Sequence, residues 1–155
     1  MSRAEKRRGA RLSVVQALYE MEVGGRGVNE AMAEFEAFWI GKEVEEIALP
    51  QAEIAFFRDL LGGVVREQRL VDRTVDELLA KGWPLKRVEA VVRAILRSGA
   101  YELAFRKDVP ARAVISEYVA VARAFYDGEE IGMVNAVLDR MAREFRADEF
   151  DIPAA

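Results

Sequence analysis

The chain has 155 residues and a formal net charge of −4, with 52% hydrophobic and 32% charged side chains. This length and composition are ordinary for one globular domain with a real core. Cysteine and histidine are both absent, which excludes disulfides, zinc sites built on thiolate or imidazole, and histidine as a general base. No apolar run approaches the roughly 18 residues of a membrane span, and no signal-type segment opens the chain, so we expect a cytoplasmic protein.

Positive charge is concentrated at the amino end. Residues 1–12 contain five basic side chains and one acidic side chain, which leaves 18 basic and 26 acidic side chains in the other 143 residues. An acidic body with a basic arm binds nucleic acid poorly as a whole, so any such contact requires a local site. This distribution argues against a protein that coats nucleic acid.

The first predicted helix covers residues 2–21 and carries basic and apolar side chains on one face. Ser2 and Glu5 have the spacing of a capping box. Cations in the first turns oppose the helix macrodipole at roughly 0.3–1 kcal/mol each, and a bound phosphate would relieve that cost. We therefore expect the guanidinium groups to project into solvent as a phosphate receptor, with a solvated, frayed terminus as the alternative. At 100° per residue, the shared arc contains Arg7, Arg11, Val14, Leu18 and Met21, with Arg8 beside it.

Turn residues divide the rest of the chain into further helices. The glycines at 24–27 end the first helix, and Asn29 is a candidate cap for a second one whose apolar stripe includes Phe35, Phe38 and Trp39. After a loop at 41–50, apolar spacing over 54–79 predicts one long helix or two helices joined near Glu67. Three more helices are expected, beginning after Pro84, Pro110 and Gly128.

The predicted fold class is all-α, because no segment alternates with period two for long enough to be a convincing strand. We expect a compact bundle of six or seven helices, in two three-helix halves that meet near Trp83. Gly99 lies on the apolar face of its helix, which predicts a close helix crossing there. Arg97 and Glu117 are expected to form a buried ion pair between helices.

Four stretches of the sequence carry a more specific signal: RRGARLSVVQALYEME, FFRDLLGGVV, GWPLKRVEAVVRAILRSGAYELAFRKDVPARAVISEYVAVARAF and MVNAVLDRMA. In order and spacing they resemble the NusB family of transcription antitermination factors, over roughly residues 5–145. The resemblance implies a single NusB-like helical RNA-binding domain at 1–147. The composition of residues 148–155 predicts a flexible acidic tail after it.

The resemblance also implies a protein that catalyses no reaction. It implies a non-enzymatic adaptor that binds the single-stranded boxA element of ribosomal RNA leaders. The partner would be the ribosomal protein NusE, within an RNA polymerase antitermination complex that supports processive elongation. No metal or cofactor is expected, and the resemblance leaves open a monomer or a weak homodimer.

Carried over residue by residue, the resemblance gives RNA-binding candidates in the first and last helices. Many members place an aromatic residue before the VN of VNxVLD, and this chain has Met133 there, which cannot stack on a base as an aromatic ring does. Packing is the alternative role for Tyr19, and a structural hydrogen bond is the alternative for Asn135. The candidates are Arg7, Arg8, Arg11, Tyr19, Met133 and Asn135.

Two other functions remain open. NusB-like domains also occur at the amino end of ribosomal RNA cytosine methyltransferases, but such an enzyme would need a nucleotide-binding α/β domain, and this chain contains no G-x-G-x-x-G motif. The other alternative is a purely protein-binding helical module, in which the arginine row would be incidental.

Overall fold

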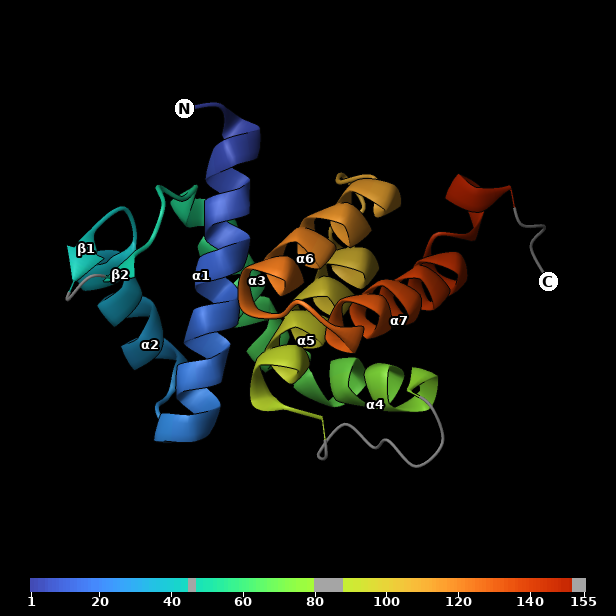
Figure 1. Cartoon of the computed structure of the whole chain (residues 1–155), viewed down its shortest axis with the longest axis horizontal. Coiled ribbons are helices and arrows are strands. Elements are labelled where there is room, and N and C mark those ends of the chain that lie inside the picture. The colour runs from blue at the N-terminus through green and yellow to red at the C-terminus, as the bar shows by residue number, and fades with distance from the viewer. Residues whose placement is uncertain (45–46, 80–87, 152–155) are drawn as a thin grey trace. The chain divides into compact units, whose positions relative to one another are not determined.

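The computed structural model describes residues 1–44, 47–79 and 88–151. Over these ranges the chain is all-α, as predicted, apart from one antiparallel pair of two-residue strands (Figure 1). It divides into two compact units, Met1–Arg66 and Glu67–Ala155. The first unit contains α1 (Arg3–Gly24), α2 (Val28–Glu34), a π-helical turn (Phe35–Trp39), β1 (Glu43–Val44), β2 (Ile47–Ala48) and α3 (Ile54–Arg66). The second contains α4 (Gln68–Leu78), α5 (Ala90–Phe105), α6 (Ala111–Phe125), α7 (Glu129–Phe145) and a 3-10 turn (Ala147–Phe150).

The boundary between the units differs from the predicted one near Trp83, which lies outside the described residues. It falls at Glu67, where φ of −101° and ψ of 19° interrupt the helical backbone. The apolar period over 54–79 therefore belongs to two helices, α3 and α4. Among the described residues the units contain three and four α-helices, which agrees with the predicted total of six or seven.

The predicted ends of the first helix are confirmed. The Glu5 N–H donates to the Ser2 hydroxyl at 3.1 Å, and that hydroxyl donates to a Glu5 carboxylate oxygen at 3.1 Å. At the other end Gly25 adopts φ of 70°, and its N–H donates to the Met21 carbonyl at 2.9 Å. A residue with a side chain is strained in this left-handed conformation, so glycine ends the helix here.

The second helix differs from its prediction in two respects. It begins at Val28 with Gly27 in the capping position, so Asn29 lies inside the helix instead of capping it. Its last turn widens, and the Ile40 N–H donates to the Phe35 carbonyl at 2.9 Å, five residues back. This π turn shifts the register: Phe35 stacks on buried Phe57, whereas Phe38 is 64% exposed and leaves the predicted apolar stripe.

In the second unit α7 packs on α5 and α6, and Gly99 lies at the predicted close crossing. A Cβ on Gly99 would lie 2.9 Å from a methyl of Leu138 and 3.4 Å from the Tyr118 ring. The Tyr118 hydroxyl donates to Glu102 at 3.0 Å and is 2.7 Å from the Ser98 hydroxyl. Arg97 forms an inter-helix ion pair with Asp72 of α4, in which Nε and Oδ1 are 2.7 Å apart.

The carboxyl-terminal segment begins as an ordered turn, although its composition predicts a flexible tail. Ala147–Phe150 form a 3-10 turn next to Arg146, whose side chain is 1% exposed. Glu149 accepts hydrogen bonds from the Ala111 N–H at 2.8 Å and from Arg146 at 2.6 Å. These bonds tie the turn to the start of α6.

Acid pH is expected to weaken this attachment. The backbone hydrogen bond from Ala111, followed by the one from Arg146, outweighs desolvation and holds the pKa of the Glu149 carboxyl below its usual value. A carboxyl with a depressed folded-state pKa stabilises the fold above its unfolded-state pKa, and that contribution is lost as the pH falls through the folded-state pKa. Urea unfolding of wild type and Glu149→Gln should therefore differ at neutral pH and converge at acid pH. A difference that is independent of pH would contradict this role for the ionised carboxylate.

Candidate nucleic-acid interface

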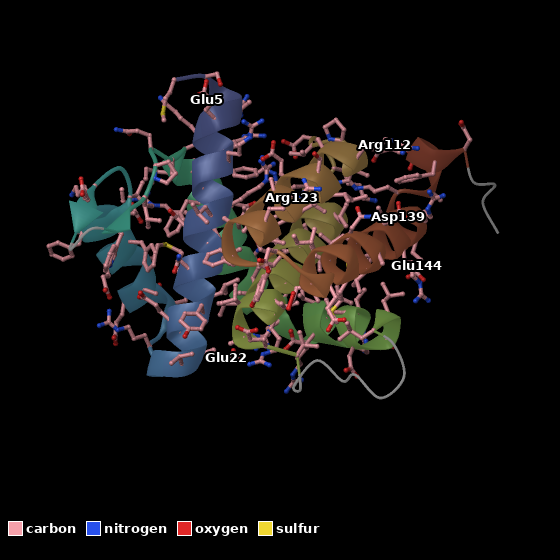
Figure 2. All side chains as sticks on the ribbon, in the orientation of Figure 1. Glu5, Glu22, Arg112, Arg123, Asp139 and Glu144 are labelled. Carbon is pink, nitrogen blue, oxygen red and sulfur yellow. The ribbon has the colours of Figure 1, made fainter. Side chains whose placement is uncertain are left out.

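The amino-terminal half of α1 lies directly against the segment that precedes α3. A Cβ on Gly9 would lie 2.0 Å from the Gln51 carbonyl oxygen, so only glycine allows this approach. The Glu53 N–H donates to the Lys6 carbonyl at 3.0 Å. Figure 2 labels Glu5 and Glu22 near the two ends of α1, and the α1 candidates lie between them.

Arg7 and Arg11 share one face of α1, as predicted, but that face is packed. Their guanidinium carbons lie 4.4 Å and 5.0 Å from the centre of the Phe56 ring, within the range of cation–π attraction. The Arg7 side chain is 14% exposed and Arg11 is 4% exposed. The expectation that the whole row projects into solvent is therefore wrong for Arg11, because its guanidinium is covered within the fold.

A carboxylate also contacts the arginines at this end of α1. One oxygen of Glu53 accepts hydrogen bonds from Nε of Arg3 at 3.1 Å and from Nε of Arg7 at 3.4 Å. Desolvation disfavours ionisation of Glu53, but the hydrogen bonds and positive charges of both arginines outweigh it and hold the pKa of this carboxyl below its usual value. Glu53 is therefore ionised at neutral pH and partly offsets the positive charge at this end of α1.

Arg8 and Tyr19 are the exposed candidates of α1. Eleven residues correspond to about three turns, so both side chains lie on the same side of the helix, about 16 Å apart along its axis. Val15, between them, is fully buried. A nucleic-acid strand would therefore touch the two ends of this side and not its middle.

The candidates of the last helix lie in the second turn of α7. Asn135 is exposed and Met133 is half-buried, whereas Val134 between them is fully buried. Because Asn135 is exposed, water can satisfy its amide, and the amide does not need a structural hydrogen bond within the fold. Glu129 and Glu130 occupy the first turn of α7, and their charges oppose a phosphate at the backbone N–H groups there.

Sequence reasoning missed two residues of the interface. Phe56 has the spacing of a core side chain, and nothing in the sequence shows that two guanidinium groups stack on it. Glu53 lies 46 residues from Arg7 in sequence, and a single acid in a loop carries no signal of its partners. Only the three-dimensional packing of α1 on α3 brings these groups together.

One cluster of polar side chains lies inside the second unit. Ser98, Glu102 and Tyr118 form a hydrogen-bonded chain, but all three are fully buried, so a substrate does not reach them. No group of three or more acidic side chains within the described ranges is placed to hold a metal ion. Among the helices described, none has the length and apolar character needed to cross a bilayer.

Comparison with known proteins identifies the family. The profile of the NusB family matches residues 8–143, which include most of α1 and of α7. The chain belongs to the NusB family. Its all-α architecture is also that of solved NusB structures. The structure of T. maritima NusB has a TM-score of 0.75 and 26% identity, covering 98% of this chain and 99% of that one.

Similar NusB proteins match along most of their length. The transcription antitermination protein NusB of Rhodopseudomonas palustris (strain TIE-1) is 61% identical over 148 residues, covering 96% of this chain and 85% of the relative. The protein of the same name from Bradyrhizobium diazoefficiens is 60% identical, covering 96% and 90%. A structure of the antitermination factors NusB and NusE in complex with dsRNA has the same fold, with a TM-score of 0.71 at 22% identity, over 94% of this chain and 100% of that one.

Proposed function

We propose that this chain is a non-enzymatic transcription antitermination factor that binds single-stranded boxA RNA of ribosomal RNA leaders together with NusE. In this role it would support processive elongation by RNA polymerase. The observation that carries the proposal is a cluster of guanidinium groups in the amino-terminal half of α1, in a chain that is acidic elsewhere. Its relatives are named transcription antitermination proteins, which supports the same function. We refer to these groups as the α1 cluster, which consists of Arg3, Arg7, Arg8 and Arg11.

The structure supports different roles for the three candidate arginines. Arg8 is exposed and lies on the same side of α1 as Tyr19, so we assign Arg8 to direct phosphate contact and Tyr19 to contact with a base or sugar. Arg7 and Arg11 are mostly covered and stack on Phe56. They contribute positive potential behind Arg8, because charges in a low-dielectric environment act over longer distances than charges in water.

The proposed contribution of α7 is smaller. Exposed Asn135 offers both a hydrogen-bond donor and an acceptor to an unpaired base. Half-buried Met133 adds apolar contact but not the stacking of an aromatic ring, which is worth about 1–3 kcal/mol per base. RNA affinity is therefore expected to depend on the α1 cluster and on a protein partner that binds at the same time.

The methyltransferase alternative receives no support from the names of the relatives, since those compared are antitermination proteins. An RNA titration distinguishes the proposed function from the protein-binding alternative. Labelled boxA RNA and a scrambled RNA of the same length would be titrated with the chain, with and without NusE. The proposal expects tighter binding of boxA RNA and a further gain with NusE; equal affinity for both RNAs, unchanged by NusE, would favour a protein-binding module.

Arg8→Glu is expected to weaken boxA RNA binding about tenfold, equivalent to about 1.4 kcal/mol, because it replaces a phosphate-binding cation with an anion. Losing one phosphate contact should also reduce the slope of log affinity against log salt by about 0.7. Fluorescence anisotropy at several KCl concentrations measures both quantities. Circular dichroism would establish that the helices remain intact.

Arg112→Glu is the matched control for this prediction. Arg112 is exposed in the first turn of α6 (Figure 2). A short connection joins the other end of α6 to α7, so Arg112 and Asn135 lie towards opposite ends of this helix pair. The change of charge is the same, and an acid is favourable near a helix amino end. Wild-type RNA affinity is expected for Arg112→Glu; equal losses in the two variants would mean that only the net charge matters and would remove Arg8 from the site.

A further inference from the structure

Backbone hydrogen bonds join Glu53 to both α1 and α3. Its N–H donates to the Lys6 carbonyl of α1 at 3.0 Å, and its carbonyl accepts from the Phe57 N–H of α3 at 3.0 Å. The neighbouring Gln51 lies against Gly9, where a Cβ would lie only 2.0 Å from the Gln51 carbonyl oxygen. The fold therefore positions the Glu53 carboxylate beside the amino-terminal turns of α1.

This carboxylate occupies donors that a phosphate would otherwise use. A single oxygen of Glu53 accepts from Nε of both Arg3 and Arg7. The Glu53 side chain is 25% exposed and that of Arg3 is 73% exposed, so the group lies at the rim of the fold, within reach of a ligand. Carboxylate and phosphate oxygens compete for the same guanidinium donors, since both are anionic acceptors with bidentate geometry.

We propose that Glu53 is an internal competitor for RNA phosphate and sets an upper limit on the RNA affinity of the α1 cluster. This inference rests on the proposed RNA-binding function. A phosphate that approaches exposed Arg3 must displace a charge-assisted hydrogen bond, and the ionised carboxylate repels it and offsets the positive potential of the mostly covered Arg7. The competition acts on the Arg3 and Arg7 part of the cluster, since these two side chains donate to Glu53.

The consequence concerns affinity for RNA of any sequence. Phosphate contacts position a strand and carry no sequence information directly. Glu53 therefore lowers affinity for boxA and unrelated RNA by the same factor, and it keeps the isolated chain from binding tightly to every available RNA. Tight binding then requires additional contacts to bases or to a protein partner.

Glu53→Gln tests this inference, because it removes the charge and retains both backbone hydrogen bonds and nearly the same side-chain volume. It is expected to bind boxA and scrambled RNA each about threefold to fivefold more tightly than wild type, since the ion pairs at stake are partly exposed. The salt dependence should steepen by about 0.7 for each phosphate contact that is released. Glu53→Ala should change affinity in the same direction.

Glu36→Gln is the matched control. Glu36 also pairs with an arginine in the first unit, with a hydrogen bond of 3.0 Å from Nε of Arg58, and its substitution changes the net charge equally. Its RNA affinity is expected to equal that of wild type. If Glu53→Gln and Glu53→Ala bind no more tightly than Glu36→Gln, or if both lose their helical circular dichroism, the inference is overturned while the proposed function stands. If wild type binds neither RNA, the proposed function and the inference both fail.

Discussion

Arg146→Leu is expected to lower the free energy of unfolding by about 3–5 kcal/mol, because it removes the donor from several buried carbonyls, at about 1–3 kcal/mol for each one left unsatisfied. The Arg146 side chain is 1% exposed, and its guanidinium donates hydrogen bonds to surrounding backbone carbonyls. It donates to the carbonyls of Leu103 at 2.7 Å, Val109 at 2.9 Å and Arg106 at 2.9 Å. Leucine retains much of the volume but removes the Arg146 hydrogen bonds from these carbonyls and from the Glu149 carboxylate, which keeps only its bond from the Ala111 N–H.

Arg143→Leu is the control for this prediction. Arg143 lies three residues earlier on α7, is 49% exposed and pairs with Asp139 at 2.9 Å. Its loss is expected to cost less than about 1 kcal/mol, because the pair is exposed to solvent. Urea unfolding followed by circular dichroism would measure both variants. Comparable losses would mean that Arg146 contributes little beyond an ordinary surface arginine.

Arg146 also illustrates a contact that the sequence alone does not predict. An arginine close to the end of a helix is usually solvent-exposed, and the acidic residues after it have the composition of a flexible tail. The burial of Arg146 depends on carbonyls at the carboxyl end of α5 and just after it, to which its guanidinium donates. Those carbonyls lie about 40 residues earlier in the chain, so no local pattern contains the information.

The sequence alone predicts those features of the fold that depend on interactions between residues close together in the chain. Apolar side chains with a period of 3.6 predict the helices, because each helix must bury one face. The cap at Ser2 and the stop at Gly25 follow from short-range hydrogen bonding and from the conformational freedom of glycine. The close crossing at Gly99 follows from a small residue on an otherwise apolar face.

The candidate site is predicted less completely, because it depends on tertiary contacts. The angular positions of Arg7 and Arg11 follow from helical geometry, and they do share a face. Whether that face is open or covered depends on the packing of α3, which brings Phe56 beneath both guanidinium groups. Periodicity gives the direction of a side chain relative to its own helix and not the identity of its neighbour.

Gly9→Ala is expected to destabilise the chain by about 2 kcal/mol, although alanine is the better helix former. In an open helix this substitution would stabilise by up to about 1 kcal/mol. Here the new Cβ would lie 2.0 Å from the Gln51 carbonyl oxygen and 3.0 Å from its carbonyl carbon. Both atoms belong to the backbone, so the 50–53 segment or α1 must move, at a cost of about 1–3 kcal/mol for overpacking and about 1 kcal/mol for a lost hydrogen bond.

This movement is expected to break the hydrogen bond from the Glu53 N–H to the Lys6 carbonyl. Gly132→Ala supplies a control of opposite sign, since Gly132 lies in α7 and a Cβ added there would meet no neighbouring group of the described residues within 4 Å. It should raise the free energy of unfolding by about 0.5–1 kcal/mol. Urea denaturation of both variants measures the difference. If Gly9→Ala is as stable as Gly132→Ala, the contact between α1 and the 50–53 segment is too weak to hold Glu53 beside Arg3 and Arg7.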